Sequence, residues 1–146
     1  MTERTCEAVT QELLSRYGVD YANLLDLRAQ VRNGDWATAS DLIKVVRPQF
    51  EFIGAELSGF LEPALVDVVE ALPHARLLEG DSESLLRRSR NMAIMLKDSL
   101  EANDPFWSCI VAYALSDTLE RLGHHIEARV APVEVSQSEP QSLGIV

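Results

Sequence analysis

Apolar residues recur at helical spacing along most of this chain, and this pattern constrains the fold more than any other feature of the sequence. Between Cys6 and Tyr17, for example, they fall every three or four residues, which places them on one face of a helix. No alternation of period two lasts long enough to predict a sheet. The sequence therefore predicts an all-α protein.

Capping and stop residues divide the first third of the chain into three expected helices. Gly18 is expected to end the first helix, and Asp20 to start a second one. The second helix is expected to end at Asn33-Gly34, where Asp35 caps the third. Because almost no loop separates the last two, they are predicted to form an antiparallel hairpin.

From Phe50 to Leu72 the apolar residues keep one helical register, but Gly59 and Pro63 lie inside this run. A proline removes one backbone hydrogen bond, and its ring crowds the carbonyl group four residues earlier. The sequence therefore predicts a break or a sharp kink between Ser58 and Glu62.

The two strongest helix starts lie in the second half of the chain. Asp81 or Ser82 is expected to cap a helix that runs to Ala102. Asp104-Pro105 combines a capping carboxylate with proline at the first helical position, and the helix that follows is expected to end near Gly123. Its apolar residues cover more than half of its circumference, which predicts a central helix.

We therefore expect a single domain in which six or seven helices form an irregular antiparallel bundle. Residues 1–130 are expected to form the helical domain. The remaining residues, 131–146, are rich in Ser, Gln and Pro and are expected to form a flexible C-terminal tail. A short α-solenoid is the alternative architecture.

The solenoid alternative comes from a local resemblance. Gly34-Asp35-Trp36, followed by Ala39, resembles the start of the second helix in a tetratricopeptide hairpin. The resemblance covers one hairpin, and no second copy follows at a period of about 34 residues. Since a solenoid needs about three stacked repeats, the bundle is the first expectation.

Charge indicates the kind of partner that the chain suits. With 13 basic and 23 acidic residues, its formal net charge is −10. Such a field repels phosphates and anionic lipid and attracts basic proteins, so we expect neither a nucleic-acid nor a membrane partner. No apolar run approaches the roughly 20 residues of a membrane span, and the acidic start differs from a signal peptide, which predicts a cytoplasmic protein.

Few residues suggest catalysis or metal binding. Glu120 lies one helical turn before His124, which makes the two a weak candidate metal pair without a third ligand. Cys6 and Cys109 belong to no C-x-x-C pair and are expected to be buried thiols. The sequence contains neither a G-x-S-x-G elbow nor a Gly-x-Gly loop, so we predict no catalytic residue and no cofactor.

A run of carboxylates in the middle of the chain is the candidate partner-binding surface. Between residues 51 and 79 the chain carries dense acidity, with Arg76 as the counter-charge. Carboxylates gathered in this way speed association with a basic partner and add specificity. Trp107 joins them because aromatic residues are enriched at binding hot spots. The candidate residues are Glu51, Glu56, Glu62, Asp67, Glu70, Glu79 and Trp107.

The sequence thus favours a non-enzymatic protein-binding module of the inhibitor, immunity or adaptor type. Its acidic surface would occupy a basic protein partner such as a toxin or an effector. One alternative is a helical-bundle enzyme, or a protein that binds a metal or another ligand. The other is a homo-oligomeric structural protein, in its simplest form a homodimer.

Overall fold

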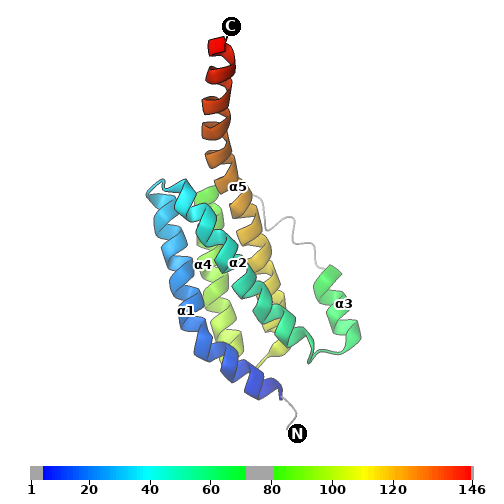
Figure 1. Ribbon diagram of the computed structural model, residues 1–146. Coiled ribbons are helices and arrows are strands. Elements are labelled where there is room, and N and C mark those ends of the chain that lie inside the picture. Colours follow the sequence, from blue (N-terminus) through cyan, green and yellow to red (C-terminus); the bar gives the residue numbers. More distant parts are fainter. Residues whose placement is uncertain (1–4, 72–80, 146) are drawn as a thin grey trace.

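The computed structural model describes residues 5–71 and 81–145, with side-chain surroundings for 5–68 and 81–130. These residues contain helices and turns and no strand, which confirms the all-α prediction. They form five helices instead of the expected six or seven (Figure 1). The helices are α1 (Cys6–Arg32), α2 (Trp36–Ser58), α3 (Pro63–Ala71), α4 (Ser82–Glu101) and α5 (Pro105–Ile145).

The expected stop at Gly18 is wrong, because α1 continues through it without interruption. Buried Leu13 and Leu24 lie on either side of Gly18 along one face of the helix. Packing of that face offsets the cost of roughly 1 kcal/mol that a glycine adds to a helix interior. Asp20, the expected cap of a second helix, instead lies inside α1.

The expected helix that Asp35 caps and the helical run expected from Phe50 also form one continuous helix up to Ser58. Residues 36–58 form one helix that passes through Pro48. Pro48 is exposed, while Val46 and Phe50 on either side of it are buried. The proline therefore lies on the outer face of α2, where its missing N–H group and its ring disturb the packed face least.

The break predicted before Pro63 is confirmed. Helix α2 ends at Ser58, the chain turns over four residues, and α3 starts with Pro63 as its first residue. In the turn, the amide of Phe60 donates to the carbonyl of Leu57. The carbonyl of Glu62 accepts the first hydrogen bonds of α3.

The predicted caps of the later helices are also confirmed. The carboxylate of Asp81 accepts a hydrogen bond from the amide of Ser84 at 2.8 Å. At the start of α5, the carboxylate of Asp104 accepts one from the amide of Trp107 at 3.0 Å. Satisfying the free N–H groups of a helix start in this way is worth about 1 kcal/mol per cap.

The predicted end of the last helix near Gly123 is wrong, since α5 continues to Ile145. Gly123 is buried, and a Cβ atom built on it would lie 3.5 Å from the side chain of Ile43. This glycine serves close packing against α2 and does not end a helix. The boundary between a domain at 1–130 and a tail at 131–146 remains a prediction.

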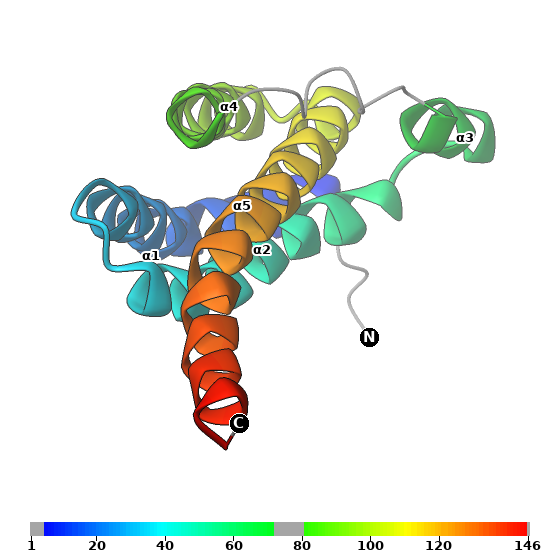
Figure 2. The same ribbon diagram turned by 90° about the horizontal axis from the view of Figure 1, so that it is seen from above.

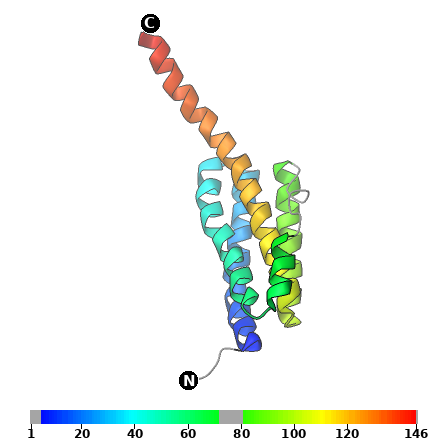
Figure 3. The ribbon, with the colours of Figure 1, turned by 90° about the vertical axis from the view of Figure 1, so that its right-hand side faces the viewer.

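The four long helices lie side by side, in the order α1, α2, α5, α4 around the molecule (Figure 2). Neighbouring helices run in opposite directions, and α5 extends past the end of the other helices (Figure 3). The α2–α5 interface is the most extensive, and of the neighbouring pairs in this group α1–α4 has the least extensive one. Helix α3 lies outside the group beside α5 (Figure 1).

The core lies between these four helices. Its largest fully buried side chains come from all of them, and Phe50 of α2 contacts Tyr17 of α1 ring edge to ring face, with centroids 6.4 Å apart.

In the part of the chain that the structure describes, no helix is both long enough and apolar enough to cross a membrane.

Candidate functional site

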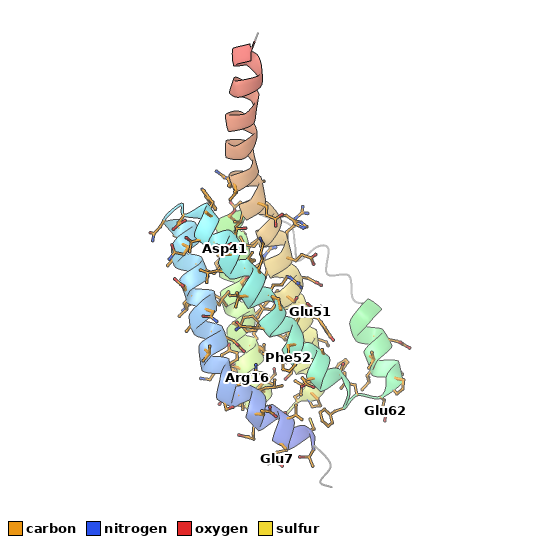
Figure 4. The ribbon with its side chains drawn as sticks, in the orientation of Figure 1. Glu7, Arg16, Asp41, Glu51, Phe52 and Glu62 are labelled. Carbon is orange, nitrogen blue, oxygen red and sulfur yellow. The ribbon has the colours of Figure 1, made fainter. Side chains whose placement is uncertain are left out.

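The predicted carboxylates whose side chains the structure describes are Glu51, Glu56, Glu62 and Asp67, and they differ in surroundings. Glu51 is exposed on α2, and its carboxylate pairs with the guanidinium of Arg47 at 2.7 Å (Figure 4). Glu56 is half-buried and has an interaction partner. Glu62 and Asp67 are both exposed, the first just before α3 and the second within it. The side chain of Glu70, and Glu79 as a whole, lie outside the described residues.

Helix α3 exposes apolar side chains next to these carboxylates. Leu65 is 36% exposed and Val68 48% exposed, and Phe60 in the preceding turn is 37% exposed. The contact of α3 with α5 is slight. We call Phe60, Glu62, Leu65, Asp67 and Val68 together the α3 surface. It combines exposed apolar groups with two carboxylates.

Trp107 does not join the predicted carboxylates. Its ring is 44% exposed and lines a hollow of about 310 Å³ with Met95 of α4. The carboxylates beside it are Asp98 and Asp104. Trp107 therefore lies beside two acidic residues that are not among the six carboxylates with which it was grouped from the sequence.

Glu120 and His124 lie one turn apart on α5, as predicted. Both are exposed and line a hollow of about 270 Å³ between α2 and α5. Lys44, Arg47 and Glu127 line the same hollow, so the candidate pair shares it with two basic groups and one further carboxylate. Within residues 5–68 and 81–130, no group of three or more His, Cys, Asp or Glu side chains is arranged to hold a metal ion.

The two cysteines are free thiols. Cys109 is fully buried in α5, and its Sγ atom donates a hydrogen bond to the carbonyl of Gly54 at 3.3 Å. Burial raises the pKa of the Cys109 thiol to about 12. At neutral pH this thiol is therefore protonated and a poor nucleophile. Cys6 is half-buried near the start of α1.

Basic side chains gather around Glu83 at the start of α4. The carboxylate of Glu83 accepts a hydrogen bond from the guanidinium of Arg32 at 2.7 Å. That bond, together with the charges of Arg32, Arg28 and Arg87, lowers the pKa of Glu83. Three arginine side chains therefore act on Glu83 at this end of the bundle.

A groove between α1 and α4 was not predicted from the sequence. Leu14, Tyr21 and Ile94 line it, together with the carboxylate of Asp98, and its volume is about 500 Å³. The groove forms because residues 14–21 lie beside residues 94–98, and neither segment carries a motif. The exposed position of Ile94, with 41% of its surface accessible, becomes visible only in the fold.

Comparisons of the chain with family models, with curated proteins and with solved structures found no match.

Proposed function

We propose that this chain is a non-enzymatic protein-binding module of the inhibitor, immunity or adaptor type, and that its α3 surface binds a basic protein partner. The observation that carries the proposal is the exposure of apolar side chains on α3. The carboxylates of the same surface indicate that the partner is positively charged.

Helix α3 is more apolar than is usual for a helix at the surface of a protein. A helix that is apolar around most of its circumference normally lies buried between other elements. In α3, Leu65 and Val68 are exposed on one side while Val66 is only partly covered on another. Grouped apolar side chains at a surface are typical of sites where another protein binds.

Charge favours a basic partner. Glu62 and Asp67 are exposed beside these apolar groups, and the whole chain has a formal net charge of −10. Carboxylates at the rim of an apolar contact speed the approach of a basic surface and disfavour an acidic one. The partner should therefore present apolar side chains surrounded by Lys and Arg.

Capture from a lysate of the native host tests the proposal when wild type is compared with matched variants. One variant, Leu65→Ser with Val68→Ser, removes the apolar contact. The control, Val19→Ser with Val45→Ser, makes the same change at exposed valines of α1 and α2. A basic protein that wild type and control retain, and that the α3 variant loses, is the expected result.

The charge component is then measured with the purified partner. Glu62→Gln with Asp67→Asn should weaken binding about three- to tenfold at low salt, because each exposed pair is worth up to about 1 kcal/mol. The same change at Glu7 and Asp41, exposed carboxylates on α1 and α2 (Figure 4), should have little effect. Equal binding by wild type and all variants at low salt would refute the α3 surface as the binding site.

A further inference from the structure

The groove between α1 and α4 has the size and the lining of a small-molecule site. Its volume of about 500 Å³ falls within the range of about 300–1,000 Å³ for ligand pockets. Leu14, Tyr21 and Ile94 give it an apolar and aromatic lining, and the charged groups Lys97 and Asp98 lie at its edge. Mainly apolar walls with a few polar groups are the usual composition of such sites.

Gly18 lines this groove but has no packing role there. A Cβ atom built on Gly18 would have no side chain or neighbouring backbone within 4 Å, and the residue lies inside α1 with ordinary helical geometry. Neither the turn of the backbone nor a neighbouring helix therefore requires glycine at this position. What the missing side chain provides is open space between Leu14 and Tyr21 on the same helix.

Two tyrosine rings form the aromatic side of the groove. The rings of Tyr17 and Tyr21 are stacked, with centroids 5.9 Å apart. The hydroxyl of Tyr17 donates a hydrogen bond to the carbonyl of Ala93 on α4, which fixes the position of its ring. The faces of aromatic rings carry partial negative charge and attract cations.

The charges around the rings are also suited to a cation. Among the described residues, no ion pair is formed by the Asp98 carboxylate, whereas Lys97 pairs loosely with Glu101 at 3.9 Å. Besides burial, the nearby Tyr21, Asp20 and Asp98 raise the pKa of Tyr17. Since Lys97 has Glu101 as its partner, the Asp98 carboxylate is the charged group of the lining that is left to attract a cation.

We propose that the α1–α4 groove binds a small organic cation, an ammonium group carried on an aromatic body. The aromatic body occupies the space beside Gly18 and contacts Tyr21 and Ile94, while the ammonium group lies near the carboxylate of Asp98. The site is separate from the α3 surface and does not depend on the proposed function.

The test uses three probes of similar shape and different charge: 2-phenylethylammonium, neutral 2-phenylethanol and anionic 3-phenylpropionate. Each is titrated into the full chain, labelled with nitrogen-15, and backbone amide shifts are followed. The cation should bind most tightly and the anion most weakly, and the shifts should lie in residues 14–21 and 94–98.

Two variants locate the probe, each with a matched control. Asp98→Asn should weaken binding of the cation about two- to fivefold, the size of a cation interaction at an exposed site, and leave the neutral probe unchanged. Gly18→Leu should fill the groove and weaken binding of both the cation and the neutral probe more than about tenfold. Asp41→Asn and Ala55→Leu make the same changes on the exposed side of α2 and should alter neither affinity.

Several results would overturn the proposal. These are equal affinity for the cation and the neutral probe, shifts confined to other residues, and unchanged binding by Gly18→Leu. Shifts in the groove that depend on protein concentration without any probe would assign the groove to a second copy of the chain and also overturn it. A negative result in these titrations would not test the proposed function of the α3 surface, because the α3 variants and the groove variants share no residue.

Discussion

The α2–α5 and α1–α4 pairs are both antiparallel, and each contains a glycine inside a helix, but Gly54 and Gly18 have opposite surroundings. A Cβ atom on Gly54 of α2 would lie 3.1 Å from the ring of Tyr113 on α5. A Cβ atom on Gly18 of α1 would meet nothing within 4 Å. One glycine lets a ring pack against a helix backbone, and the other leaves a groove.

This difference shows where the bundle is tightly packed and where it is open. Along α2–α5 the thiol of Cys109 reaches the backbone of Gly54, and Leu119 is fully buried. Along α1–α4, Ile94 lines the groove and remains 41% exposed. Stability is therefore concentrated at α2–α5, and the α1–α4 side can accept another molecule at little cost to the fold.

The largest expected effect is a difference in the free energy of unfolding between two variants, each with one side chain shortened in one of the two interfaces. Leu119→Ala removes a fully buried group that faces α2 and should lower the free energy of unfolding by about 2–5 kcal/mol. Ile94→Ala removes a group that is 41% exposed and should lower it by less than about 1 kcal/mol. Urea unfolding of both variants measures the difference, and equal losses would mean that the α1–α4 side is as tightly packed as α2–α5.

The next effect comes from adding one methyl group to the closed interface. Gly54→Ala should lower the free energy of unfolding by about 1–2 kcal/mol, since crowding against Tyr113 costs about 1–3 kcal/mol and the higher helix propensity of alanine returns up to about 1 kcal/mol. In a Tyr113→Ala background the same change should no longer destabilise. If the loss persisted there, crowding against the ring would not be its cause.

The same methyl group in the open interface should have the opposite sign. Gly18→Ala should raise the free energy of unfolding by about 0.5–1 kcal/mol, because alanine favours the helix and the new group meets no neighbour. Thermal or urea unfolding gives the sign directly. A loss of stability would show that the added methyl group contacts a neighbouring atom.

Three helix starts were predictable from the sequence because they depend on local chemistry, whereas the start expected at Asp20 lies inside α1. Asp35, Asp81 and Asp104 each accept a hydrogen bond from an amide three residues later, and the chain breaks where Gly59 and Pro63 coincide. Gly18 and Gly123 gave the same local signal as a helix end. Both lie inside helices, since the packing of residues far away in the sequence decides whether a glycine ends a helix or permits a contact.

The candidate sites were less predictable for the same reason. Exposure of Leu65 and Val68 depends on where α3 lies relative to α5, and the sequence does not state it. The sequence placed Trp107 with the carboxylates of residues 51–79, but in the hollow beside α4 its neighbours are Asp98 and Asp104. Long-range contacts bring these groups together, and no local pattern encodes them.

The smallest expected effect depends on pH and concerns Asp20, which lies on α1 with only 8% of its surface exposed. Burial raises the pKa of its carboxyl group, although the charge of Arg16 lowers it. The folded protein therefore holds this proton more tightly than the unfolded chain does. Its contribution to stability is fully present below the ordinary aspartate pKa of about 3.9 and is lost as pH rises through the raised value.

Asp20→Asn mimics the protonated carboxyl group and removes this loss. The variant and wild type should be equally stable near pH 3, and the variant should be the more stable one at pH 7, with the gap opening between the ordinary and the raised pKa. Urea unfolding across this pH range measures the gap, and Asp41→Asn on the exposed face of α2 is the control. A gap that stayed constant with pH would mean that the asparagine acts through hydrogen bonding or packing, and that the charge of Asp20 is not its cause.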